Sequence, residues 1–226
     1  MTQWNSDKEL FELGRRELYT AVVGDICDQI GLRHQFLSPQ IRPLEPPGQC
    51  QVMIGRAMTV LEADVFSEPE GNHPFGQMLV ALDDLQQDEV YICAGSSPRY
   101  ALVGELMCIA MRSRGAVGAV CDGYIRDCQR IFEMSYPVFS LGPYAQDQRG
   151  RGMVIDFRVT IEINNVVIHP GDVIMGDIDG VLVVPSDAVE EVFTQALTKV
   201  RGENIARDAL LNGLTASEVF TKHGIL

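Results

Sequence analysis

Hydrophobic and polar positions follow two different periods along the chain, and these periods divide it into helices and strands. Apolar residues recur at helical spacing in some segments, whereas short runs of branched apolar residues mark strands. A proline-rich connector follows the second helix, because proline denies the backbone helical hydrogen bonds. The predicted helices are 7–17, 20–30, 76–86, 102–114 and 186–211, with a short last helix after Thr215, and the predicted strands are 51–62, 89–93, 117–121 and 137–141.

The order of these elements indicates the fold class. Strands separated by helices of about a dozen residues favour parallel pairing, with the helices covering the sheet. Residues 154–185 instead combine short β runs with turn signals at Pro170-Gly171-Asp172 and Asp179-Gly180, which is typical of β-hairpins. The sequence therefore predicts one α/β domain over residues 1–226, with a central partly parallel sheet, flanking helices and a long C-terminal helix.

Several residues are predicted to mark helix ends. Thr20 is expected to cap the second helix and Gly31 to stop it. Gly213 is expected to end the long helix. Thr215 and Glu218 have the spacing of a capping box for the last helix.

Composition and charge exclude several function classes. The chain is 46% apolar and 22% charged, which is the balance of a globular protein. Its net charge of −13 would repel a phosphate backbone, so no nucleic-acid substrate is expected. No apolar run approaches the ~18 residues that a membrane span needs, and the start of the chain does not resemble a signal peptide. We expect a cytoplasmic protein with no membrane partner.

The six cysteines are dispersed along the chain. They form no C-x-x-C pair and no paired cysteine and histidine spacing. We therefore expect reduced thiols, most of them buried, in place of a zinc site or a disulfide framework.

A candidate anion site lies where a predicted helix opens at Gly104-Glu105-Leu106-Met107. The first backbone N–H groups of a helix have no acceptor within it, and they carry a partial positive charge. The amides around Leu106 and Met107 are thus suited to hold a carboxylate. Gly104 would let that anion come close, because it has no side chain.

One strand further along the chain, Arg126 and Asp127 follow a turn. The guanidinium of Arg126 is a permanently charged, forked donor that could stabilise negative charge on a 2-oxo acid. Asp127 beside it offers a hard oxygen ligand for Mg²⁺ or Mn²⁺. From these residues alone, a structural or surface ion pair is the alternative.

Glu105, followed after twenty residues by Arg126-Asp127, resembles the D/E-x20-R-D signature of the class II pyruvate aldolases. This family is typified by 4-hydroxy-4-methyl-2-oxoglutarate/4-carboxy-4-hydroxy-2-oxoadipate aldolase. It shares its fold with the regulator of ribonuclease E activity A. The resemblance extends over most of the chain, through Thr20-Ala21 with Asp25 and Asp28 and the blocks 54–60, 136–139 and 170–185.

The resemblance implies a swivelling α/β/β-sandwich that assembles as homotrimers or hexamers, with active sites at subunit interfaces. It implies that Asp127 binds the divalent metal, that Arg126 contacts the oxo and carboxylate oxygens of the substrate, and that Glu105 holds a water on the metal. Glu203, on the long helix, would reach the metal shell of an adjacent subunit. Where the aldolase pattern continues R-D-x2-[DE], this chain has Arg130, which leaves the identity of the substrate undetermined.

The lysines favour a metal-dependent route over a Schiff base. The chain contains only Lys8, Lys199 and Lys222, all in terminal helical regions. The predicted function is a lyase that cleaves a 4-hydroxy-2-oxo acid to pyruvate and a second carbonyl compound, with oxaloacetate decarboxylation as a second activity. The loop from Asp64 to Gly76, with Asn72, is expected to bind the distal part of the substrate.

The main alternative is a non-catalytic, protein-binding regulator of a ribonuclease on the same scaffold. The intact Arg126-Asp127 pair argues against it, because a binding surface needs no metal ligand beside an oxyanion clamp. A phosphohistidine domain, a nucleotide-dependent methyltransferase and an EF-hand are disfavoured, because the histidine contexts, the glycine spacing and the distal glutamate that they require are missing.

Overall fold

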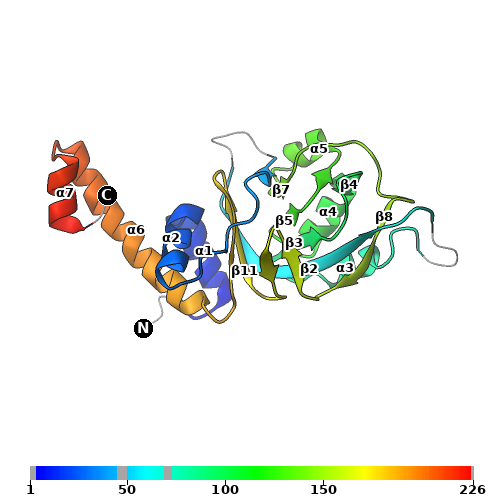
Figure 1. Ribbon diagram of the computed structural model, residues 1–226, viewed down its shortest axis with the longest axis horizontal. Helices are drawn as coiled ribbons and strands as arrows, with labels where there is room; N and C mark the ends of the chain where they lie inside the picture. Colours follow the sequence, from blue (N-terminus) through cyan, green and yellow to red (C-terminus); the bar gives the residue numbers. More distant parts are fainter. Residues whose placement is uncertain (1–3, 45–49, 69–72, 225–226) are drawn as a thin grey trace.

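The structure, a computed structural model, describes residues 4–44, 50–68 and 73–224 of the chain (Figure 1). Its helices are α1 (Asp7–Glu17), α2 (Thr20–Gln29), α3 (Met78–Asp84), α4 (Glu105–Ser113), α5 (Cys128–Glu133), α6 (Val189–Leu211) and α7 (Ala216–His223). Its strands are β1 (Arg42–Pro43), β2 (Met53–Asp64), β3 (Glu89–Ala94), β4 (Ala101–Val103), β5 (Gly118–Cys121), β6 (Tyr124–Ile125), β7 (Val138–Ser140), β8 (Gly152–Phe157), β9 (Ile161–Ile163), β10 (Val166–Ile168), β11 (Val173–Asp177) and β12 (Gly180–Val184).

A central sheet organises the fold, with strand order β1-β7-β5-β3-β2-β11-β12 and with β8 also paired to β2. The strands β2, β3, β5 and β7 are parallel to their neighbours in this group. The strands β1, β8 and β11 join the group antiparallel, and β12 is antiparallel to β11. The predicted partly parallel sheet is thus confirmed.

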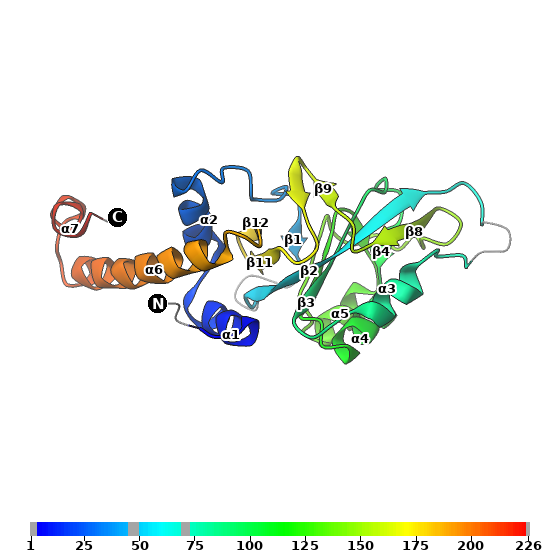
Figure 2. The ribbon, with the colours of Figure 1, turned by 90° about the horizontal axis from the view of Figure 1, so that it is seen from below.

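Two different layers cover the faces of this sheet. Side chains of a strand alternate between its two faces, so Met58 and Val60 of β2 pack with the α3–α4 side, whereas Met53 and Ala57 pack with the β9–β10 hairpin. Figure 2 shows α3, α4 and α5 on one side of the sheet and β9 on the other. This arrangement is an α/β/β-sandwich, as predicted.

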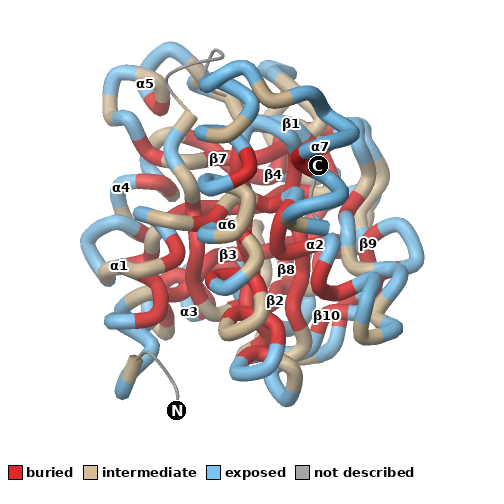
Figure 3. Tube along the Cα trace, turned by 90° about the vertical axis from the view of Figure 1, so that its left-hand side faces the viewer, coloured by how far each residue is buried: buried red, intermediate tan, exposed pale blue. Residues whose placement is uncertain are grey.

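A third cluster of apolar residues joins the two ends of the chain. Phe11 of α1 and Phe193 of α6 are both buried in it against β11 and β12. Beyond this contact the rest of α6 extends away from the sheet and carries α7 (Figures 1 and 2). In Figure 3 the buried positions gather in the strands, while the outer turns and loops are exposed.

Two predicted helix starts need correction, and one helix was not predicted. The predicted helix 102–114 begins only at Glu105, because residues 101–103 form β4 and pair with β6. The long helix begins at Val189 and not at Ser186. The six-residue helix α5 was not predicted, since its short sequence contains no extended apolar period. The capping box of Thr215 and Glu218 is confirmed.

The prediction that Thr20 caps the second helix was also wrong, because Thr20 donates hydrogen bonds there and accepts none as a cap. Thr20 is the first residue of α2 and does not accept a hydrogen bond as its cap. Its backbone N–H and its hydroxyl each donate to the carboxylate of Asp177, over 2.7 Å. A carboxylate at the end of β11 therefore satisfies the start of α2, where the helix dipole favours negative charge.

Replacing Asp177 should destabilise the fold. Because Asp177 is 5% exposed, Asp177→Ala leaves two buried donors of Thr20 without an acceptor. We expect a loss of about 1–3 kcal/mol in the free energy of unfolding, measured by urea denaturation. Asp179→Ala, in the exposed turn after β11, is the matched control and should change the midpoint little. Equal midpoints for the two variants would contradict the capping role of Asp177.

Candidate active site

The candidate site forms where two short strands end side by side. The strands β4 and β6 are parallel, with Ala101 opposite Tyr124 and Val103 opposite Ile125. The N–H of Arg126 continues this pairing by donating to the carbonyl of Val103 over 3.0 Å. Because the carboxyl ends of parallel strands lie at the same edge, the start of α4 and the Arg126-Asp127 pair meet there.

Asp127 links the two segments through its side chain. Its Oδ2 atom accepts a hydrogen bond from the N–H of Glu105 at 3.2 Å and lies 3.8 Å from Nε of Arg126. Its backbone adopts a left-handed conformation, with φ 60° and ψ 28°, which aspartate tolerates better than most residues. This turn ends β6 and starts α5, so that the carboxylate faces the first turn of α4.

Gly104 is required here by close approach and not by its backbone conformation, since its φ is −130°. A Cβ atom at this position would lie 2.8 Å from Oδ2 of Asp127 and 3.3 Å from Nε of Arg126. Any side chain would therefore push both functional groups away from the helix start. The sequence analysis expected Gly104 to make room for a bound anion. In the structure, Gly104 makes room for the side chains of Arg126 and Asp127.

Asp147 is a site residue that the sequence analysis missed. Its Oδ1 atom lies 3.0 Å from Nη1 of Arg126, so the guanidinium is shared between the carboxylates of Asp127 and Asp147. The side chains of Arg126, Asp127 and Asp147 are 39%, 46% and 36% exposed, respectively, which leaves all three accessible to a ligand. The segment before β8 has no periodic pattern, and only tertiary folding brings Asp147 to the site.

A pocket of about 320 Å³ adjoins these groups. It is a size that suits a small molecule. It is lined by Phe75, Met78, Leu79, Leu82, Ala101, Leu102, Val103, Gly104, Leu106, Met107, Ala110, Arg126, Asp127, Asp147 and Gln148.

The first turn of α4 contributes donors to this pocket. The N–H of Glu105 is used by Asp127, whereas the N–H groups of Leu106 and Met107 have no acceptor within the helix. Both residues line the pocket. The turn is thus placed to bind an oxyanion beside Arg126.

The remaining candidates lie elsewhere. Asn72 falls outside the described residues. Glu203 accepts a hydrogen bond from the Tyr19 hydroxyl and lines a separate cleft of about 570 Å³ with Asp25 and Lys199. Burial, followed by the hydrogen bond to Glu203, raises the pKa of Tyr19 to about 12. Within its own protomer Glu203 therefore does not join the pocket of Arg126.

Arg130 occupies the position at which the aldolase pattern has an acid. Its guanidinium pairs with Glu133 at 3.2 Å on the exposed side of α5. Arg130 does not line the pocket of Arg126 and Asp127.

The donors present suit a hard divalent cation. In the described part of the chain no three histidine, cysteine, aspartate or glutamate side chains gather as a metal cluster. Mg²⁺ commonly keeps several waters and takes only one or two protein carboxylates together with substrate oxygens. The carboxylate of Asp127 is exposed, and it accepts a hydrogen bond from the N–H of Glu105, the first residue of α4.

Most of the cysteines are buried, as the sequence predicted. The buried ones are Cys27, Cys93, Cys108 and Cys121. Among the described residues, none of the helices has the length and apolar character that crossing a membrane requires.

The buried side chain of Glu62 forms a hydrogen bond with one of the residues that line the pocket. Glu62 of β2 is 1% exposed, and its Oε2 accepts a hydrogen bond from the amide of Gln148, which lines the pocket. Its Oε1 has no partner among the described residues. Burial raises the pKa of Glu62 to about 8, against the lowering effect of the Gln148 amide. The carboxyl is therefore protonated at neutral pH.

The chain is an α/β/β-sandwich with a pocket beside Arg126 and Asp127, and the comparisons place it within a family. Residues 20–183 match the RraA-like family, described as aldolase/RraA. The chain belongs to this family.

Individual relatives agree with this assignment. A protein of Halalkalibacterium halodurans named "Putative 4-hydroxy-4-methyl-2-oxoglutarate aldolase" is 27% identical over 209 residues, which cover 91% of this chain and 90% of that protein. Protein DlpA of Legionella pneumophila is 26% identical over 200 residues, which are 88% of this chain but only 31% of DlpA. The chain thus spans about a third of the length of DlpA.

A solved structure shows the same fold. It is that of Streptomyces coelicolor RraAS2, described as an unusual member of the RNase ES inhibitor RraA protein family. The TM-score is 0.76 at 22% identity, with 90% of this chain and 98% of that chain covered.

The protonated Glu62 predicts a pH dependence of stability. The carboxyl has its ordinary pKa near 4.5 in the unfolded chain and about 8 in the folded chain, so its contribution is fully present below 4.5 and is lost as the pH rises through 8. We expect wild type to lose stability relative to Glu62→Gln by about 1.4 kcal/mol per pH unit between pH 5 and 8. Denaturant titrations of both proteins at several pH values measure this difference, and a constant difference would contradict it.

Proposed function

We propose that the chain is a divalent-metal-dependent lyase that cleaves a 4-hydroxy-2-oxo acid to pyruvate and a second carbonyl compound. The observation that carries this proposal is the pairing of a guanidinium with a metal-competent carboxylate at a helix start that lines a pocket. The relatives named as aldolases support a carbon–carbon lyase. Oxaloacetate decarboxylation, which develops the same negative charge, would be a second activity.

The residues have separable tasks in this reaction. Arg126 would bind the 2-oxo and carboxylate oxygens of the substrate with its forked donors, and the amides of Leu106 and Met107 would complete the anion site. A divalent cation held by Asp127 would supply Lewis-acid stabilisation of charge on the 2-oxo oxygen. Asp147 would keep the guanidinium in place through its 3.0 Å contact.

Cleavage also requires proton transfer. The C4 hydroxyl loses its proton, the C3–C4 bond breaks with its electron pair going toward C3, and C3 then takes up a proton to give pyruvate. Glu105 is half-buried at the first position of α4, beside Asp127. We assign it the task of positioning a water that carries these protons.

A homotrimer or hexamer is part of the proposal. Because Glu203 lies in a separate cleft of its own protomer, it could complete the metal shell only in a neighbouring protomer.

The decisive test is release of pyruvate from a panel of 4-hydroxy-2-oxo acids and from oxaloacetate, followed with lactate dehydrogenase. We expect turnover with Mg²⁺ or Mn²⁺ and its loss after EDTA treatment, with recovery when the metal is restored. The absence of turnover on every acid, combined with specific capture of ribonuclease E, would instead support the regulator function.

Removal of either central side chain should abolish most of this activity. Arg126→Ala and Asp127→Ala are each expected to lower kcat by about 100-fold or more, because each removes a group that stabilises developing negative charge. Arg114→Ala is the matched control, since its guanidinium forms an exposed ion pair with Asp83 at the other end of α4. Full metal-dependent activity in Asp127→Ala would rule out the assigned role, provided that all variants have the same circular dichroism.

A further inference from the structure

Glu62 is a buried acid that has no part in the reaction proposed above. Its side chain is 1% exposed, and among the described residues it makes a single hydrogen bond, which its Oε2 accepts from the amide of Gln148. Its Oε1 has no partner there. Burying a carboxyl group that is only partly hydrogen-bonded costs stability that an apolar side chain would keep. Such departures from full satisfaction occur chiefly at functional sites, so Glu62 calls for a functional explanation.

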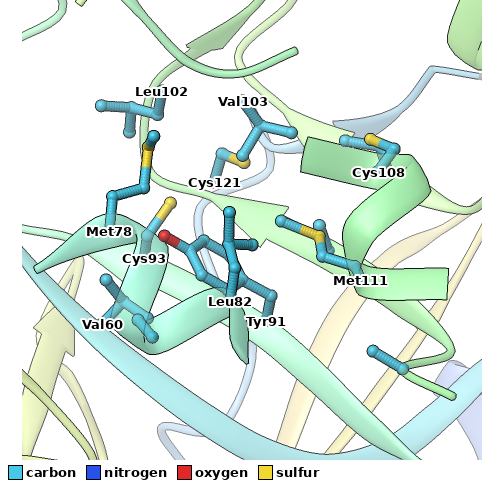
Figure 4. Packing of buried hydrophobic residues seen from close by; sticks show 14 of the residues in the cluster. Val60, Met78, Leu82, Tyr91, Cys93, Leu102, Val103, Cys108, Met111 and Cys121 are labelled. Atoms are coloured by element: carbon cyan, nitrogen blue, oxygen red, sulfur yellow. The ribbon is translucent and has the colours of Figure 1, made fainter. Parts of the chain in front are cut away.

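The surroundings of Glu62 are largely apolar. Val60, two residues earlier on β2, belongs to the core between the sheet and the α3–α4 side, and Figure 4 shows it in the same cluster as Tyr91 and Cys93. Burial, followed by the nearby Cys93 and Glu62, raises the pKa of Tyr91, which places Glu62 beside this cluster. In this layer, the amide of Gln148 is the polar group that Glu62 contacts.

Gln148 and Asp147 are consecutive residues whose side chains contact different parts of the molecule. Gln148 is 3% exposed and donates to Glu62 in the core, although it also lines the pocket. Asp147 reaches the other way, and its Oδ1 lies 3.0 Å from Nη1 of Arg126. A displacement of Gln148 would therefore move the carboxylate that contacts Arg126.

The backbone of this segment is attached to two further strands. The carbonyl of Gln146 accepts the N–H of Ala101, the first residue of β4, over 2.9 Å. The carbonyl of Gln148 accepts the N–H of Gly152, the first residue of β8, over 2.9 Å. The side chain of Gln148 adds a third attachment, to β2. All three are contacts within one protomer, so they do not depend on what a neighbouring copy adds to the site.

We propose that Glu62 is a positioning residue for Arg126: through Gln148 it sets the place of the Asp147 carboxylate, and through that carboxylate it sets the direction of the guanidinium. This inference rests on the proposed lyase function and adds a residue outside the pocket to it. The forked donors of Arg126 must point at the substrate oxygens, because hydrogen bonds weaken steeply with misalignment. A guanidinium that is already held also loses less conformational entropy when the substrate binds.

Two replacements of Glu62 test the proposal through pyruvate release from 4-hydroxy-4-methyl-2-oxoglutarate and oxaloacetate with Mg²⁺. Glu62→Met removes the acceptor, and kcat/KM should fall by about tenfold, less than for Arg126→Ala because the two backbone attachments remain. Glu62→Gln keeps a neutral acceptor for Gln148 and should stay within about twofold of wild type. Wild-type kcat/KM in Glu62→Met would overturn the inference and leave the lyase function intact.

Thr59→Val is the matched control for a loss of core stability. Thr59 lies on the same strand, is fully buried, and donates its hydroxyl to the carbonyl of Val159, away from the pocket. The variant loses a buried hydrogen bond of β2 and should keep the wild-type kcat/KM. A fall equal to that of Glu62→Met would show that general destabilisation explains the effect, and the proposal would be wrong.

A second variant tests whether Glu62 acts through Gln148. Gln148→Met removes the donor of the same hydrogen bond, so kcat/KM should fall by about the same factor as in Glu62→Met. The double variant should be no worse than either single variant, because both remove one interaction. Losses that multiply in the double variant would contradict an action through Gln148.

The order of the Arg126 side chain provides a readout that needs no turnover. Its Nε–H signal in NMR spectra is identified by its loss in Arg126→Ala. The heteronuclear NOE should be that of an ordered group in wild type and Glu62→Gln, and that of a mobile group in Glu62→Met. No pyruvate release by wild type would overturn the lyase function, yet this contrast would still support the positioning of Arg126. An ordered Arg126 in Glu62→Met would overturn the inference at any level of turnover.

Discussion

The parallel pairing of β4 with β6 is the constraint on which the candidate site depends. Each strand is only two or three residues long, yet together they bring the first turn of α4 against Arg126 and Asp127. The contact is close enough that a side chain at position 104 would collide with both functional groups. Backbone geometry thus makes neighbours of the first-turn amides of α4, the guanidinium of Arg126 and the carboxylate of Asp127.

The surrounding layers hold these two strands in place. The helices α3 and α4 pack on one face of the central sheet, and the apolar side chains between them form both the core and the wall of the pocket. Residues such as Met78 and Leu82 therefore belong both to the core and to the pocket wall. Behind the pocket, Glu62 is kept neutral by burial and holds Gln148, which connects a core strand to the segment that carries Asp147.

Membership of a family establishes the fold of this chain but does not establish which reaction it catalyses. Its fold is shared with RraAS2, whereas an active site requires specific groups in a specific arrangement. Arg126 and Asp127 line one pocket together, and Arg130 lies outside that pocket despite its place in the aldolase pattern.

The sequence by itself determined the alternation of strands and helices, the β-rich segment before the long helix and the capping box at Thr215, because these depend on local periodicity and capping chemistry. It also singled out Gly104 as a glycine at a helix start, whereas Arg126 and Asp127 stood out mainly because their spacing from Glu105 resembles a family signature. Only the tertiary structure decided that Asp177 caps α2, that β4 precedes α4 and that Asp147 reaches Arg126. These contacts join residues about twenty or more positions apart, and no local propensity records which distant partner will satisfy a given charge or N–H group.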